Sequence, residues 1–350
     1  MSDKKPIGLI CATAIIGLIL GAGGYYLFTP GTSGSGGNVP QRPAHEEPSG
    51  ANPQQGTQDP QQPGETSSEQ GSSASSGSKV IDVSILHHFA VGLRADGTVA
   101  YAGSNERVRE ELGSWRNIIQ VEAGSSDIIG LKSDGTVVTV NTDGKKYDVE
   151  NWTNIIAVAA GAESIFALRS DGTYNCVVFG TVFENEGSNI KAISAGPNGN
   201  ALLSADGTVN IDTWNMDRVE QWSDIIAISG GGGRVMGLKS DGTVVASDYY
   251  TDEEKAEIAG WRNITALSVG LVDIALKSDG TVVTLNNPRS DRSGKIEFNN
   301  AFRATNWTDI VAIASGDTHI IGIKSDGSVV VVNNENYSSR ATVILDFSSW

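Results

Sequence analysis

Cysteine is scarce in this sequence, which holds two copies among 350 residues. Cys11 lies in an apolar run near the N-terminus, so the rest of the chain carries only the thiol of Cys176. A chain with one thiol cannot close a disulfide on itself, and its cysteines therefore do not report the redox compartment.

Basic residues are also few. The 25 Lys and Arg are outnumbered by 41 Asp and Glu, which gives a formal net charge of −16 and a pI of about 4.6. A surface that follows phosphates needs clustered Lys and Arg, and the sequence contains no such cluster. We therefore expect no nucleic-acid partner.

The common catalytic motifs are missing as well. The sequence has no GxSxG elbow, no HExxH pair and no GKS or GKT phosphate loop. Of its four histidines, His45 lies in a low-complexity segment, and the adjacent His87 and His88 would point to opposite faces of one strand. We expect no enzyme, no catalytic residue, no cofactor and no metal site.

One segment begins like a calcium-binding loop, with Asn141, Asp143 and Gly144. Lys145 stands at the next ligand position, and no Glu closes the loop at the twelfth position, where a bidentate carboxylate belongs. We therefore expect an ordinary turn there.

The N-terminal region contains one long apolar run, Ile7–Phe28, which has no charged residue. As a helix its 22 residues would span roughly 33 Å, enough for a bilayer core. Two lysines precede it and no basic residue follows before Arg42, so the positive-inside rule predicts a cytoplasmic tail at 1–6, a transmembrane signal-anchor at 7–28 and an extracytoplasmic remainder. The alternative is a cleaved signal peptide with Gly21–Gly24 as the cleavage region.

The next segment, 29–79, is rich in Gly, Ser, Pro and Gln and holds seven of the ten prolines. Such a composition cannot bury enough apolar surface to offset chain entropy. The sequence predicts a disordered linker that holds the rest of the chain away from the membrane.

From residue 80 to residue 350 the chain repeats. An Asp-Gly pair recurs at steps of 38, 37, 35, 35, 38 and 47 residues, with its glycine at Gly97, Gly135, Gly172, Gly207, Gly242, Gly280 and Gly327. A tryptophan marks six of the repeats, at Trp115, Trp152, Trp222, Trp261, Trp307 and Trp350. Gly187 holds the equivalent place in one further repeat, and a glycine follows this position after nine residues in six repeats, at Gly124, Gly161, Gly196, Gly231, Gly270 and Gly316.

The copy Trp152–Thr173 shows what one repeat builds. Two short apolar runs, 155–159 and 164–169, are predicted strands, and Asp171-Gly172 predicts a type I′ hairpin turn into a third strand at 173–178. A fourth short strand fits the variable segment before the next tryptophan. About four strands per 40 residues are typical of a propeller blade, so we predict an all-β, seven-bladed β-propeller with the tryptophans as wedges between blades.

The two ends of the repeat region complement each other. The first repeat lacks the segment that should precede its strand at 80–85, and the C-terminal segment 341–350 supplies one that ends at the landmark tryptophan. We therefore expect the N- and C-terminal strands to pair and close the ring, which would remove an open sheet edge.

The pattern W-x-x-I-x-A-x-x-x-G, followed by L-K-S-D-G-T-V at 131–137 and 238–244, resembles the RCC1 repeat (regulator of chromosome condensation), most of all its short bacterial form. The resemblance covers 80–350 and implies a seven-bladed propeller. The glycine-rich segment of the family is reduced here to 102–105, and the histidine that such repeats often carry survives only as His319. The family's nuclear nucleotide-exchange role is not expected of an acidic propeller behind a membrane anchor.

The candidate binding residues lie in the variable segments between repeats, because loops on a rigid scaffold carry recognition. Trp214 is the one tryptophan outside the repeat register, and it either caps a blade edge or anchors a partner. The segment 248–257 carries five acids and is predicted as a solvated loop or one helical turn, or as an acidic patch for a basic partner. The other candidates in these segments are Tyr249, Tyr250, Arg289, Arg292, Phe302 and Tyr337.

Two functions follow from this organisation. The first is a surface-displayed interaction module whose variable segments bind an unknown protein or a cell-wall or surface ligand. The second is a carbohydrate-binding or hydrolytic propeller, which the aromatic residues in these segments suggest; hydrolysis would require two converging carboxylates.

Overall fold

The computed structural model describes the backbone of residues 18–20 and 25–27 and most of the chain from residue 78 onward. The latter part comprises 78–86, 89–162, 164–196, 199–213, 216–231, 234–270, 272–285, 301–316, 319–333, 347 and 350.

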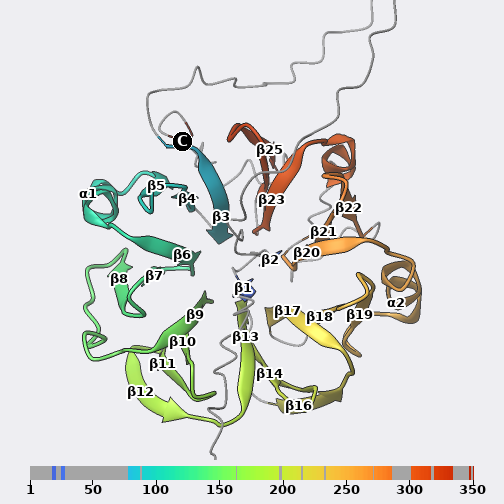
Figure 1. Ribbon diagram of the computed structural model, residues 1–350, viewed down its shortest axis with the longest axis horizontal. Helices are drawn as coiled ribbons and strands as arrows, with labels where there is room; N and C mark the ends of the chain where they lie inside the picture. The colour runs from blue at the N-terminus through green and yellow to red at the C-terminus, as the bar shows by residue number, and fades with distance from the viewer. Residues whose placement is uncertain are drawn as a thin grey trace, which may run out of the picture. The chain divides into compact units, whose positions relative to one another are not determined.

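Seven antiparallel sheets follow one another along the chain from residue 80 to residue 333 and stand around a common centre (Figure 1). In each sheet the strands lie in the order in which they occur in the sequence. Blade 1 is β3 (Val80–Leu86), β4 (Phe89–Arg94) and β5 (Val99–Ala102), blade 2 is β6 (Ile118–Ala123), β7 (Asp127–Lys132) and β8 (Val137–Asn141), and blade 3 is β9 (Ile155–Ala160), β10 (Ser164–Arg169), β11 (Tyr174–Val178) and β12 (Thr181–Glu186).

The other four sheets continue the ring and return it to blade 1. Blade 4 is β13 (Ile190–Gly196), β14 (Gly199–Ser204), β15 (Thr208–Thr213) and β16 (Met216–Gln221), and blade 5 is β17 (Ile225–Gly231), β18 (Arg234–Lys239) and β19 (Val244–Ala246). Blade 6 is β20 (Ile264–Ser268), β21 (Ile274–Lys277) and β22 (Val282–Thr284), and blade 7 is β23 (Ile310–Ser315), β24 (His319–Lys324) and β25 (Val329–Asn333). The predicted all-β class with seven blades is confirmed.

The prediction of about four strands per blade is wrong for several blades. In the described chain only blades 3 and 4 have a fourth strand, and the equivalent segments elsewhere include α1 (Glu106–Ser114), α2 (Asp252–Ile258) and the 3₁₀ helix η1 (Ala301–Asn306). Side-chain capping explains both α-helices. Asn105 accepts a hydrogen bond from the N–H of Val108, and Thr251 and Glu254 form a complete capping box.

The Asp-Gly turns are not of the predicted type I′. Only the glycine of each pair has a positive φ, 79° at Gly135, whereas Asp134 does not. The N–H of Gly135 donates to the carbonyl of Lys132 at 3.0 Å, which is the three-residue hairpin that ends in a left-handed glycine. The Asp134 carboxylate accepts from the Thr136 hydroxyl at 2.6 Å and from its N–H at 3.0 Å, and these bonds hold the pKa of Asp134 below its usual value.

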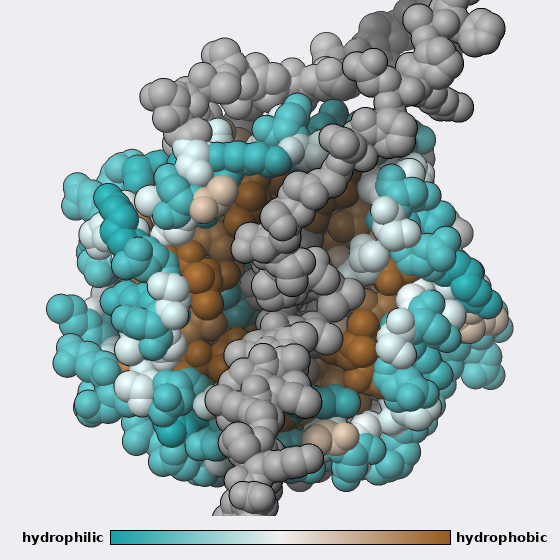
Figure 2. Space-filling model, viewed as in Figure 1, coloured by the Kyte–Doolittle hydropathy of each residue, from teal (hydrophilic) through white to brown (hydrophobic). Residues whose placement is uncertain are grey.

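Apolar side chains fill the space between adjacent blades. Trp152 is fully buried in a cluster that joins Ile129 and Leu131 of blade 2 to Ile165 of blade 3. This is the position between adjacent blades that was predicted for the landmark tryptophans. On the face shown in Figure 2, hydrophilic residues form the rim and apolar residues gather toward the centre.

The C-terminal residue belongs to blade 1. A Cβ on Gly92 in β4 would lie 2.9 Å from the Trp350 ring, the same relation that Gly130 has to Trp115. The Trp350 N–H donates to the Phe347 carbonyl at 3.0 Å, and four of the other landmark tryptophans, all but Trp222, likewise donate to the residue three positions before them. Trp350 thus stands where blade 1 requires its landmark side chain; the predicted strand pairing at 341–346 lies outside the described residues.

The N-terminal predictions stay predictions. Within 7–28 the structure describes only β1 (Leu18–Leu20) and β2 (Tyr25–Leu27), an antiparallel pair and not helix, and the linker 29–79 lies almost wholly outside the described residues. Among the residues that are described, no helix combines the length and the apolar character that crossing a membrane requires.

Candidate functional site

The blades differ most in the segment that follows their third strand. After β5 and β19 this segment contains α1 and α2, after β22 it contains η1, and after β11 and β15 it is the strand β12 or β16. The third strand pairs with the second in every blade, so each variable segment leaves the sheet beside the start of the second strand. These segments are the candidate functional surface.

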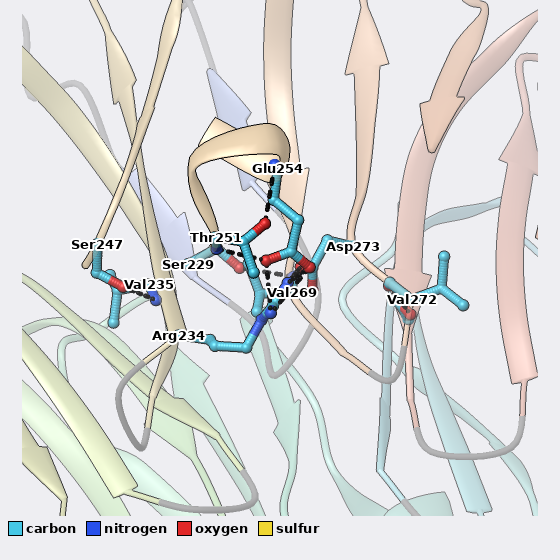
Figure 3. A network of polar contacts seen from close by, with 10 residues as sticks. Ser229, Arg234, Val235, Ser247, Thr251, Glu254, Val269, Val272 and Asp273 are labelled. Carbon is cyan, nitrogen blue, oxygen red and sulfur yellow. Dashed lines mark hydrogen bonds and ion pairs between the residues drawn. The ribbon is translucent and has the colours of Figure 1, made fainter. Parts of the chain in front are cut away.

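The best-defined variable segment is that of blade 5, where a buried ionic network holds α2 (Figure 3). Arg234, the first residue of β18, donates from Nη2 to the Asp273 Oδ2 at 2.8 Å and to the Glu254 Oε1 at 3.2 Å. Its guanidinium carbon also lies 3.7 Å from the centre of the Tyr250 ring. One arginine therefore ties together blade 5, α2 and the segment before β21 of blade 6.

Arg234 keeps its charge although the network is largely buried. The Asp273 side chain is 0% exposed, and that of Arg234 is 19% exposed. Burial is the largest single influence and disfavours the charged guanidinium, but the charge of Asp273, Tyr250 and the hydrogen bonds to Asp273 and Glu254 together outweigh it, and the pKa of Arg234 lies above its usual value. Since Arg234 already forms hydrogen bonds and ion pairs with two carboxylates, we interpret the network as an anchor for α2 and not as a reactive centre.

The anchored segment presents a defined surface. Tyr249 is 39% exposed, while its neighbour Tyr250 is 2% exposed and holds the helix from inside. Asp252 and Glu253 are exposed on the first turn of α2, and Asp248 pairs with Lys255 at 2.7 Å. The segment 248–257 therefore contains a two-turn helix where a loop or one helical turn was predicted. One of its five acids, Glu254, points inward to Arg234, so it would not contribute to the acidic patch that was the alternative.

The remaining binding candidates cannot be placed. Phe302 lies in η1, whose first three side chains are outside the described residues. Four further candidates lie outside the described residues altogether: Trp214, Arg289, Arg292 and Tyr337.

The candidate calcium loop is a turn held by side chains. Asn141 accepts from the Asp143 N–H at 2.8 Å and donates to the Asp127 carboxylate at 2.6 Å, which also accepts from the Tyr147 hydroxyl at 2.9 Å. In the part of the chain that is described, no group of three or more His, Cys, Asp and Glu could hold a metal ion. His319 is buried in β24, and burial raises the pKa of the Cys176 thiol to about 12.

Sequence reasoning missed one surface feature, the outer hairpin of blade 3. Phe179 is 65% exposed at its tip, and Phe183 is 43% exposed in β12. Phe179 and Gly180 form a two-residue loop between the paired residues Val178 and Thr181, and their φ angles are 50° and 80°. The run VVFGTVF carried a signal, since two β-rich triplets surround a residue pair that ends in glycine.

Comparison with known proteins gives the fold and no more. No protein-family model matches the chain, and no curated protein matches its sequence. Among solved structures, human WBSCR16 has a TM-score of 0.50 at 13% identity, covering 71% of this chain and 88% of that one.

Two further structures resemble it at lower scores. The CRINKLY WD40 ectodomain of the Arabidopsis thaliana receptor kinase ACR4 has a TM-score of 0.48 at 18% identity, covering 73% of this chain and 95% of that one. Yeast RCC1 (Prp20) has a TM-score of 0.39 at 14% identity, covering 72% and 69%. At these identities the likeness concerns the fold alone: the described chain is a β-propeller, and the solved propellers that it resembles include RCC1.

Proposed function

We propose that this protein is an RCC1-like binding module, anchored in a membrane and displayed outside the cytoplasm, which acts by binding a protein or surface ligand and not by catalysis. One observation carries the proposal. The blades share their internal strands, turns and packing, whereas the segment after the third strand is a helix, a loop or a strand in different blades. Divergent segments on a rigid scaffold are the usual place of recognition.

The α2 segment supports a recognition role in particular. The contacts of Arg234 with Glu254 and Asp273 fix the helix before any partner arrives, so Tyr249 and the exposed acids are held in one arrangement. A preorganised surface loses less conformational freedom on binding. Its charge favours a basic partner.

Capture from native membranes tests the binding function. The full chain, tagged at its C-terminus, should retain a partner in a salt-sensitive manner, and the double variant Tyr249→Ala, Asp252→Lys should retain less of it. Ser133→Lys, on a turn that all blades share, is the matched control and should not reduce recovery. No protein recovered above background, with glycan-array binding instead, would favour the carbohydrate-binding alternative.

The location is tested separately. The full chain should stay with membranes after an alkaline carbonate wash, and deletion of residues 1–28 should release it. Release of the full chain by the same wash would contradict the anchor and leave the binding function open.

A further inference from the structure

The blade 3 hairpin offers a second surface of different character. Its tip residue Phe179 is the most exposed large apolar side chain of the described chain, at 65%, and Phe183 on the same hairpin is 43% exposed. Both belong to the hairpin of β11 and β12, which is the outermost part of its blade (Figure 1). Several exposed aromatic residues on one element mark interaction sites more often than single scattered apolar residues do.

The backbone conformation of Phe179 argues against a purely structural reason for an exposed phenylalanine at this position. The hairpin loop has two residues, both with positive φ, which is the arrangement that favours Asn or Asp before glycine. A bulky aromatic residue is rare and strained in this region. Phe179 stays about two-thirds exposed in this conformation, and a partner that covers the ring would compensate for the strain.

The edge of β12 is suited to strand addition. Among the described strands β12 pairs with β11 alone. Val178 and Thr181 flank the two-residue loop and are a hydrogen-bonded pair, so the next pair, Val177 and Val182, does not exchange hydrogen bonds. The N–H and C=O of Val182 therefore point toward the open edge, where an extended peptide could bind them.

The charges on the hairpin indicate the kind of peptide. Between residues 172 and 190 the only charged side chains are Glu184 and Glu186, and both are exposed. The carboxylate of Glu184 accepts a hydrogen bond from the Trp152 Nε1 at 3.1 Å, which fixes its position. A second copy of this chain, with its net charge of −16, would be repelled, whereas Lys or Arg side chains would be attracted.

We propose that the hairpin Tyr174–Glu186 is a docking site for an extended segment of a partner protein with alternating apolar and basic side chains, which adds to β12 as a fifth strand. The apolar side chains of this segment would cover Phe179 and Phe183, and its basic side chains would lie beside the two glutamates. The inference rests on the proposed binding function, since it names one of the variable segments as a contact and gives the chemistry of the partner.

Selection of a phage-displayed random peptide library on the full chain tests the proposal. The peptides enriched should alternate apolar residues with Lys or Arg, and their affinity should fall with added salt. Phe179→Asn should raise the thermal midpoint, because asparagine suits the loop, and should still weaken peptide binding about tenfold or more. Phe183→Thr should weaken binding similarly and preserve strand propensity.

Two further variants distinguish binding at the open edge of β12 from nonspecific binding to exposed apolar side chains elsewhere. Val182→Pro removes the outward N–H without removing a bond to β11, so it should abolish binding of the same peptides; far-ultraviolet circular dichroism checks that it folds. Ile119→Thr removes an apolar side chain that is 47% exposed on another blade, and peptide affinity should not change.

The results that would overturn the inference are distinct from those that would overturn the binding function. Enriched peptides that bind Phe179→Asn and Val182→Pro as tightly as the unaltered chain would exclude this site, even if partner capture succeeds elsewhere. Failure to enrich any peptide would count against it as well. Concentration-dependent dimerisation that Phe179→Asn abolishes would identify a second copy as the occupant instead.

Discussion

At the scale of single residues, the repeated glycines are required by what approaches them. A Cβ on Gly124 would lie 2.3 Å from the Gly161 carbonyl oxygen, so the backbones of adjacent blades approach closely just after their first strands, β6 and β9. A Cβ on Gly130 would lie 2.8 Å from the Trp115 ring. In blade 4, which has Gly187 in place of a landmark tryptophan, the Tyr174 ring lies close against that glycine.

Gly130→Ala should therefore destabilise the protein. The added methyl group must push the Trp115 ring or β7, and overpacking of this kind costs about 1–3 kcal/mol. The matched control is Gly113→Ala in α1, where a Cβ would meet nothing within 4 Å. That variant should gain up to about 1 kcal/mol from helix propensity. Urea midpoints measure both, and equal midpoints for the two variants would contradict this packing.

Asp82 makes stability depend on pH. Its side chain is buried in β3, and burial raises its pKa to about 7, although the Val83 N–H, at 2.7 Å, partly opposes the rise. Between about pH 4 and pH 7 the unfolded chain loses this proton and the folded chain keeps it, so stability should fall as pH rises, by a total on the order of 4 kcal/mol, and then level off.

The Asp82→Asn variant should lose this part of the pH dependence, since asparagine has no proton to release and can still accept from the Val83 N–H. The measurement is the difference in unfolding free energy between the two proteins from about pH 5 to about pH 8. It should grow across this range in favour of the variant. A constant difference would show that the Asp82 carboxyl ionises freely in the folded state.

Residue identities predicted the scaffold better than the surface. One repeated residue that sequence reasoning passed over is the Asn or Asp two positions after the landmark, which has positive φ in six repeats: Asn117, Asn154, Asn189, Asp224, Asn263 and Asp309. The sequence alone could have indicated this conformation, because Asn and Asp are, apart from glycine, the residues that tolerate a positive φ best. The exposure of Phe179 could not be predicted from the sequence, because the burial of a side chain depends on how neighbouring blades pack against it.

At the scale of elements, the helices show where reasoning from the repeat went too far. A fourth short strand was expected in the variable segment because about four strands per 40 residues are typical of a propeller blade. The local signals favoured helix in two of these segments, with Thr251 and Glu254 in capping-box spacing and with Val108 and Leu112 on one helical face. Spacing fixes the length of an insertion, whereas capping residues and periodicity decide its structure.

The network at Arg234 should dominate the stability of the α2 region. Arg234→Met leaves the carboxylates of Glu254 and Asp273 buried without their cation, which should cost about 3–5 kcal/mol. The control is Lys255→Met, whose ion pair with Asp248 is 31% and 57% exposed and should contribute about 0.5 kcal/mol or less. Urea unfolding and hydrogen exchange across α2 measure both. A loss below about 1 kcal/mol for Arg234→Met would contradict the anchoring role.

At the scale of the whole molecule, serines join the blades in a repeated manner. Ser194, Ser229 and Ser268 each accept a hydrogen bond from a backbone N–H in the next blade, at 3.1, 3.1 and 2.7 Å. Ser84 does the same toward blade 2 at 3.0 Å. The sequence predicted the number of blades because one rigid unit repeats, but these inter-blade bonds became visible only once the strands were placed.

Ring closure should depend on the last residue. Trp350 packs against Gly92 in the cluster that joins blades 7 and 1, so Trp350→Ala should cost about 3 kcal/mol, the low end for a tryptophan because the ring is only partly buried. Hydrogen exchange should rise first in β3 to β5. Exchange that rises evenly over all seven blades would show that closure is not local to this residue.

The central claim is that function lies in the segments that the blades do not share. Site-specific photo-crosslinking in native membranes tests it most directly, with the crosslinker placed in turn at the exposed positions Phe179, Tyr249, Ser133 and Ala95. The account predicts crosslinks to the same partner from one or both of the first two positions, in the variable segments, and none from the last two, in the shared turns. Crosslinks from the shared turns alone would contradict it.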